Sequence, residues 1–305
     1  MCCLFGVLNY GGHNPEIDNI INQLAQEATI RGVDSTGIAY NKGGKLKVYK
    51  RPLSAYEMDF KGLSDCVTVT GHTRHATQGK KENNYNNHPF SGRSGKVNFA
   101  LCHNGVLWND KLLRERQKLP KTKIETDSYI AVQLIEKYNT FGFSALQKMA
   151  ESVQGSFTFT VTDNADNLWI IKGDNPLTLV HFPQLQLYVY ASTNEIAFAG
   201  MCHSTLVDEI EAGAFEVIHI NSGEIVKIDK SGTIETSYFD FDRFGGRGYN
   251  WQTWNSYDYA NDSDFDYLED LKTIAKMQGI PEDDIQWLID NGYTYDEIED
   301  YIYYG

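Results

Sequence analysis

CCLFGVLN, at residues 2–9, is the stretch on which the prediction of the fold depends. Its apolar run from Cys3 to Asn9 predicts a β-strand directly behind a cysteine. The stretch has neither the basic beginning nor the long apolar segment of a signal peptide, so we expect no secretory leader.

Further strands are predicted along residues 3–240, where short apolar or alternating segments recur. Gly, Asn and Asp separate most of these segments, as expected for turns between strands. The predicted strands after 3–9 are 36–41, 45–50, 66–72, 97–102, 156–162, 168–172, 178–182, 187–192, 214–220, 224–228 and 233–239.

Three helices are predicted among these strands. The first begins at Asn14-Pro15 and ends at Gly32, the second follows Thr126, and the third covers about 143–152. Each has its apolar residues spaced for one buried face. Because strands outnumber helices and no strict βαβ alternation appears, we expect an α+β fold with helices covering antiparallel or mixed sheets.

The charge of the chain is concentrated in its last part. The 305 residues have a formal net charge of −14, and residues 242–305 hold 15 acidic residues against 4 basic ones. This balance argues against binding to nucleic acid or to an anionic membrane, both of which need clustered Lys and Arg. No apolar run approaches the roughly 20 residues of a membrane-spanning helix.

The composition also divides the chain into three parts. We expect a main domain at 2–241, a Gly- and aromatic-rich linker at 242–262, and an acidic three-helix appendage at 263–305. Ser263 can cap the first appended helix, Pro281 opens the second, and Thr294 with Glu297 forms a capping box for the third. The appendage either packs on the main domain or docks a partner, and the sequence leaves both open.

Five cysteines occur in the chain, at positions 2, 3, 66, 102 and 202. An odd, sparse set of this kind predicts free thiols and a reducing compartment, so we expect a cytoplasmic protein. Removal of Met1 would make Cys2 the N-terminal residue. Its α-amine, whose pKa is ordinarily near 8, could then take the proton of its own thiol, which makes Cys2 a candidate nucleophile.

Several short motifs follow Cys2 in a fixed order. They are RGVDSTGIA at 31–39, GHTRHATQG at 71–79, NHPF at 87–90, CHNG at 102–105 and ETDS at 125–128. With the N-terminal cysteine, this set resembles the class II glutamine amidotransferases, whose glutaminase domain is an N-terminal-nucleophile (Ntn) hydrolase. The resemblance covers about residues 2–240 and implies a four-layer αββα sandwich of two packed antiparallel sheets between helical layers.

The resemblance also implies catalytic roles. Cys2 would form a γ-glutamyl thioester, and Asn104 with the backbone N–H of Gly105 would make the oxyanion hole. Arg31 corresponds to a guanidinium near the nucleophile.

Substrate contacts are implied in the same way. Arg74 would bind the α-carboxylate of glutamine and Asp127 its α-ammonium group. Thr77 and Gln78 correspond to positions with further substrate contacts. Residues 83–90 correspond to a loop that closes over bound glutamine.

The chain departs from the family pattern at three positions. Cys3 stands where glycine is usual, His75 where tryptophan is common, and Gln78 where histidine is common. We expect these changes to alter affinity more than to abolish activity.

No cofactor or metal is predicted. The possible ligands His72, His75, His88, Cys102 and His103 lie within 32 residues, but their spacing fits no standard zinc pattern.

The predicted function is therefore hydrolysis of L-glutamine to glutamate and ammonia. The chain is expected to be either a free-standing glutaminase or one whose ammonia passes to a separate synthase, and the acidic C-terminal region is the candidate docking site for such a partner. One alternative is a γ-glutamyl peptide or amine hydrolase of the same fold. Another, of a different class, is an inactive glutamine-binding regulatory module. The sequence names neither the ammonia acceptor nor the oligomeric state.

Overall fold

The computed structural model describes residues 2–76, 78–241, 272, 275, 280–290, 298 and 301–302. The chain divides into two compact units, residues 1–246 and 247–305.

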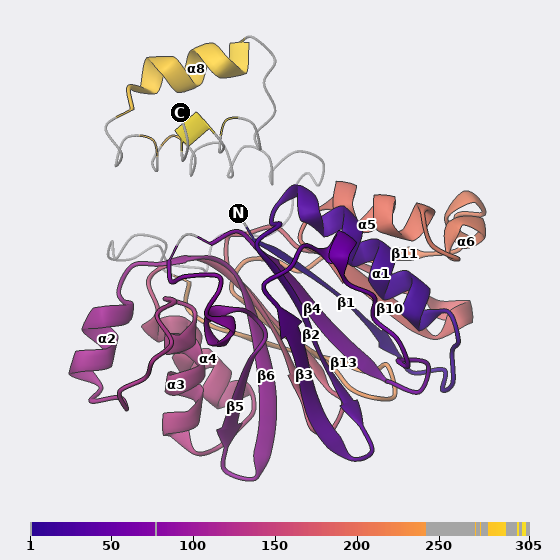
Figure 1. Ribbon diagram of the computed structural model, residues 1–305, viewed down its shortest axis with the longest axis horizontal. Coiled ribbons are helices and arrows are strands. Elements are labelled where there is room, and N and C mark those ends of the chain that lie inside the picture. Colours follow the sequence, from indigo (N-terminus) through magenta and orange to yellow (C-terminus); the bar gives the residue numbers. More distant parts are fainter. Residues whose placement is uncertain are drawn as a thin grey trace, which may run out of the picture. The chain divides into compact units, whose positions relative to one another are not determined.

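Two antiparallel sheets form the centre of the first unit (Figure 1). The seven-stranded sheet has the order β11 (Glu216–Ile218), β9 (Thr178–Phe182), β10 (Leu187–Ala191), β1 (Cys3–Asn9), β4 (Thr68–Arg74), β2 (Ser35–Lys42) and β3 (Lys45–Arg51). The six-stranded sheet has the order β13 (Ile234–Tyr238), β12 (Glu224–Ile228), β8 (Leu168–Lys172), β7 (Gly155–Asp163), β6 (Val97–Leu107) and β5 (Phe90–Ser94).

Strand β1, at the middle of the seven-stranded sheet, is buried on both faces. Leu4 and Leu8 pack between the sheets, in a cluster that includes Ile170 of β8. Phe5 and Val7 point the other way, into a second cluster with the helices. A strand buried on both faces is apolar along its whole length, which explains the unbroken run in the sequence.

Helices cover the outer face of each sheet. α1 (Ile17–Glu27) and α5 (Asn194–Cys202) lie together on the seven-stranded sheet, and the short α6 (Val207–Glu211) follows them (Figure 1). α3 (Tyr129–Tyr138) and α4 (Phe143–Ser152) pack on the six-stranded sheet, with α2 (Asp110–Arg116) beside them. The four layers are helix, sheet, sheet and helix, so the predicted αββα sandwich is confirmed.

Short 3-10 helices connect some of these elements. They cover Ala28–Ile30, Ala55–Glu57, Asn84–Asn86 and Pro183–Leu185.

All twelve predicted strands are present, and four of them (β1, β8, β9 and β12) have the predicted bounds. The predicted strand 97–102 was too short, because β6 continues to Leu107 and carries the buried polar residues His103 and Asn104. Strand β5, in which only Phe90 and Ser94 are buried, was not predicted. Nor were α2, α5 and α6; α5 is apolar on most sides, so its sequence lacks a helical stripe.

In the second unit, α8 (Glu282–Asp290) lies within the helix predicted to open at Pro281. Its Ile285 and Leu288 are buried with Ala275, Ile298 and Ile302. The predicted linker 242–262 and most of the first and third appended helices lie outside the described residues. Among the residues described, no helix is both long enough and apolar enough to cross a lipid bilayer.

The core between the sheets leads to a stability prediction. Leu8→Ala should lower the free energy of unfolding by about 3 kcal/mol, because Leu8 is fully buried between two sheets that cannot close around a cavity. Leu112→Ala, at a position 44% exposed on α2, is the matched control and should change it by less than about 0.5 kcal/mol. Urea unfolding of both variants measures the difference; equal losses would contradict this account of the core.

Candidate active site

Strands from both sheets bring the predicted site residues to one region. Cys3 of β1 pairs with Thr73 of β4, which places Cys2 beside the end of β4 where Arg74 lies. A hydrogen bond between the sheets joins His72 Nε2 to the His103 carbonyl at 2.9 Å. The segment containing Asn104 and Gly105 is thereby held against the sheet that carries Cys2 and Arg74.

Cys2 is partly buried, and its Sγ lies 3.7 Å from the carbonyl oxygen of His75. Arg31 Nε donates to the Cys2 carbonyl at 3.3 Å, which places the predicted guanidinium near the nucleophile. Burial raises the pKa of the Cys2 thiol, while Arg74 acts to lower this pKa and Asp127 acts to raise it. Both charged residues are therefore close enough to influence the sulfur.

Cys3 has a different environment, although it is adjacent to Cys2. Its side chain is fully buried in the helix-facing core, and burial raises the pKa of its thiol. Successive side chains of a strand point to opposite faces. Of the two neighbouring cysteines, Cys2 is the partly exposed one.

Arg74 is 97% buried at the end of β4. Its guanidinium donates to Asn87 Oδ1 at 2.7 Å and to the carbonyl oxygens of Gln78 and Gly79 at 2.5 and 3.1 Å. Within the described part of the chain these three hydrogen bonds fix the orientation of the guanidinium. Thr77, another predicted contact, lies outside the described residues.

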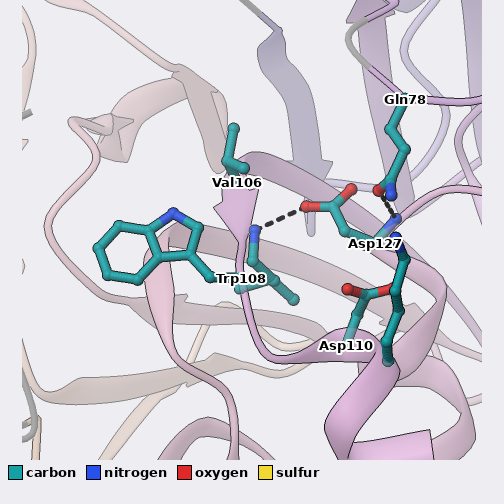
Figure 2. A pocket seen from close by; sticks show the side chains of 7 residues that line it. Gln78, Val106, Trp108, Asp110 and Asp127 are labelled. Atoms are coloured by element: carbon teal, nitrogen blue, oxygen red, sulfur yellow. Dashed lines mark hydrogen bonds between the residues drawn. The ribbon is translucent and has the colours of Figure 1, made fainter. Parts of the chain in front are cut away.

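Asp127 lies just before α3, and its carboxylate is oriented by neighbouring donors (Figure 2). The Leu107 N–H donates to Oδ2 at 2.6 Å, and the Ser128 hydroxyl donates to Oδ1 at 3.4 Å. The backbone N–H of Asp127 donates to Gln78 Oε1 at 2.9 Å. The Gln78 side chain thus serves to position Asp127, and its carbonyl serves to hold Arg74.

Asn104 and Gly105 lie within β6, where backbone packing is tight. Asn104 Nδ2 donates to Ser192 Oγ at 3.4 Å, and the same hydroxyl accepts from the Leu4 N–H at 2.8 Å. Gly105 has a φ of +132°, and a Cβ at this position would stand 2.0 Å from the Ser156 carbonyl oxygen. No other residue fits there without displacing the neighbouring strand.

A cavity of about 350 Å³ adjoins these residues. Its lining comprises Gln78, Val106, Leu107, Trp108, Asp110, Lys111 and Asp127 (Figure 2). The cavity thus reaches Asp127 and Gln78, whereas Cys2, Arg74 and Asn104 stand outside its lining.

The residues that hold the segment after β4 were not predicted from the sequence. Asp34 accepts from the Ala76 N–H at 2.8 Å and from Lys81 Nζ at 2.7 Å. Burial alone would raise the pKa of Asp34, but these hydrogen bonds outweigh it and lower the pKa. Asn86 exchanges hydrogen bonds with Glu125, at 2.7 and 3.0 Å. These partners are remote in sequence, so no local motif could have indicated them.

Three of the histidines weighed as metal ligands are buried together. The rings of His72 and His88 stack with their centroids 4.1 Å apart, and His103 Nδ1 lies 2.8 Å from Ser128 Oγ. Burial lowers the pKa of His72 to about 3 and also lowers the pKa of His88 and of His103. Among the described residues, no three His, Cys, Asp or Glu side chains are grouped as metal ligands would be.

A family model described as a glutamine amidotransferase domain matches residues 72–204. The match includes Arg74, Asn104 and Asp127 and begins after Cys2. The chain is 32% identical over 189 residues to glutamine–fructose-6-phosphate aminotransferase (isomerizing) of Streptococcus agalactiae, which covers 59% of this chain and 30% of that enzyme. The enzyme of that name from Staphylococcus aureus is 28% identical over 240 residues, covering 75% of this chain and 38% of the enzyme. This chain therefore spans about a third of the length of these curated relatives.

Among solved structures, the fold resembles glutamine phosphoribosylpyrophosphate amidotransferase from B. subtilis complexed with ADP and GMP. The TM-score is 0.62 and the sequence identity 22%, with 79% of this chain and 50% of that chain covered. At this identity the likeness concerns the fold.

The buried histidines predict that the protein loses stability in acid. Between pH 6.5 and pH 3 the unfolded chain binds more protons than the folded chain, so the free energy of unfolding falls as the pH falls. His72 alone should contribute a loss of about 2 kcal/mol between pH 6.5 and pH 5. Urea unfolding at pH 7, 6 and 5 measures this decline.

A substitution at His88 tests the cause. Neither ring nitrogen of His88 has a hydrogen-bond partner in the described part of the chain. His88→Phe should therefore keep the stability at pH 7 within about 1 kcal/mol and make the decline in acid shallower. His13→Gln, at an exposed histidine, is the control and should leave the slope unchanged. A slope that His88→Phe does not alter would contradict this explanation.

Proposed function

We propose that this chain, which carries a class II glutamine amidotransferase domain with the Ntn-hydrolase fold, hydrolyses L-glutamine to glutamate and ammonia. The observation that carries the proposal is geometric: the thiol of the partly buried Cys2 lies against the His75 carbonyl, one residue beyond Arg74, where the charges of Arg74 and Asp127 both act on it. A thiol beside one cation and one anion suits a substrate that carries both charges and a reactive amide.

The proposed reaction begins when Met1 has been removed and the α-amine of Cys2 is free. The amine takes the thiol proton, directly or through a water molecule, and the sulfur attacks the side-chain amide carbon of glutamine. The C–N bond breaks as the proton passes to the leaving nitrogen, which gives ammonia and a γ-glutamyl thioester. Water then attacks the thioester, breaks the C–S bond, and releases glutamate and the thiol.

The remaining residues supply binding and charge stabilisation. The side-chain amide of Asn104 and the Gly105 N–H would donate to the oxyanion that develops in both steps. The Arg74 guanidinium would bind the α-carboxylate, and the Asp127 carboxylate would bind the α-ammonium group. Arg31, which donates to the Cys2 carbonyl, would hold the N-terminal residue in place.

For the ammonia, we infer transfer to an acceptor bound by a separate synthase. The two curated relatives cited above are aminotransferases by name, and this chain corresponds to about a third of each. The acidic residues 242–305 are the proposed docking region for such a partner. The free cysteines suit a reducing compartment, which supports a cytoplasmic location.

Intact-mass analysis with a diazo-ketone analogue of glutamine tests the nucleophile. We expect the purified protein to lack Met1 and to gain one adduct, with loss of glutaminase activity. Cys2→Ala should neither react nor hydrolyse glutamine, because it lacks the attacking sulfur. Cys3→Ala, the matched control, should still be labelled, since the Cys3 thiol is buried in the core.

Other outcomes would overturn parts of the proposal. An adduct on Cys3 would show that the nucleophile is assigned to the wrong sulfur. An active protein that retains Met1 would exclude the α-amine as the base. Glutamine binding without turnover or labelling would indicate a regulatory module.

Loss of the oxyanion donor gives a second kinetic prediction. Asn104→Ala should lower kcat by about 10²- to 10³-fold and change KM little, because the donor acts on charge that develops in the transition state. Asn98→Ala, on the exposed part of the same strand, is the control and should retain full activity. Steady-state assays of ammonia release measure both constants; a rise in KM alone would assign Asn104 to substrate binding.

A further inference from the structure

The cavity beside Asp127 contains a second carboxylate that the proposed mechanism does not use. Asp110, the first residue of α2, lines this cavity and is only 6% exposed (Figure 2). Within the part of the chain that the structure describes, its carboxylate has no hydrogen-bond or ion-pair partner. Its oxygens are not among the fully enclosed side-chain atoms that lack a partner, so they reach the open space of the cavity, where a ligand can contact them.

The neighbouring carboxylate differs in this respect. Both oxygens of Asp127 already accept hydrogen bonds, from the Leu107 N–H and from the Ser128 hydroxyl. A primary ammonium group brings three N–H donors, and a carboxylate that already accepts two hydrogen bonds has fewer acceptor positions left to satisfy them. A second carboxylate in the same cavity would supply acceptors for the remaining N–H donors of the ammonium group.

The charge of the cavity wall also favours a cation. Its titratable lining groups are Asp110, Asp127 and Lys111. Lys111 is exposed, so water and salt screen its charge more strongly than those of the two buried carboxylates. The wall is therefore negative where Asp110 and Asp127 stand.

We propose that Asp110 and Asp127 together bind the α-ammonium group of the substrate, which makes Asp110 a specificity-determining residue for a primary amine at Cα. This inference rests on the proposed function, because it concerns recognition of the same substrate. In this proposal Asp127, which the chain already orients, accepts one part of the ammonium hydrogen bonds. Asp110, which has no partner among the described residues, accepts the rest.

Equilibrium binding separates this role from a structural one. The full chain with Cys2→Ala binds without turnover, and calorimetry gives its Kd for L-glutamine and for the analogue with hydroxyl in place of the α-amine. Adding Asp110→Asn should weaken glutamine binding about tenfold and change binding of the hydroxyl analogue less than twofold. Asp110→Glu should recover part of the affinity for glutamine.

Glu115→Gln is the matched control, since Glu115 is an exposed carboxylate on the same helix. It should change neither Kd. An Asp110 that only stabilises the beginning of α2 would, when replaced, lower the melting temperature and weaken both ligands alike; that result overturns the inference. Unchanged binding of both ligands by Asp110→Asn also overturns it and leaves the proposed function intact. Failure of the Cys2→Ala parent to bind glutamine would overturn both.

Discussion

The burial of β1 on both faces is the constraint on which the rest of the structure depends. Leu4 and Leu8 are held between the sheets while Phe5 and Val7 are held under the helices, so a shift by one residue would exchange the two sets and misfit both layers. This register decides which of two adjacent cysteines faces the site. Cys3 is enclosed by the helical layer, and the partly exposed Cys2 lies beside the end of β4 that carries Arg74.

Hydrogen bonds between buried polar groups fix how the two sheets pack against each other. The hydrogen bond from His72 to the His103 carbonyl joins the two sheets, and Ser192 connects the first strand to Asn104. Because these groups are buried, an unmade hydrogen bond would cost more than the bond itself contributes. Their effect is to hold the proposed oxyanion donors at a set position relative to the thiol, at the expense of stability in acid.

The charged side chains of the candidate site, Arg74, Asp127 and Asp110, are placed where a ligand could form hydrogen bonds with them. Arg74 is oriented by three hydrogen bonds to Asn87, Gln78 and Gly79, and Asp127 is oriented through both oxygens. Asp110 stands in the same cavity without a protein partner in the described residues. The Asp127 carboxylate is therefore already oriented before a ligand binds, and Asp110 offers a second acceptor in the same cavity. Such preorganisation lowers the free-energy cost of binding a small charged molecule.

The sequence by itself determined the strand pattern and the helices at α1, α3 and α4, which follow from local apolar periodicity and turn residues. The residues proposed for amide hydrolysis were named through the resemblance of short motifs to a known family. Tertiary structure decided the accessible sulfur, the partners of Arg74 and Asp127, and the presence of Asp110 in the cavity. Those features join positions far apart in the chain, such as Asp34 with Lys81 and Leu4 with Ser192. Such pairs form only when strands that are distant in the sequence come together in one sheet, and nothing in the local sequence around either residue indicates its partner.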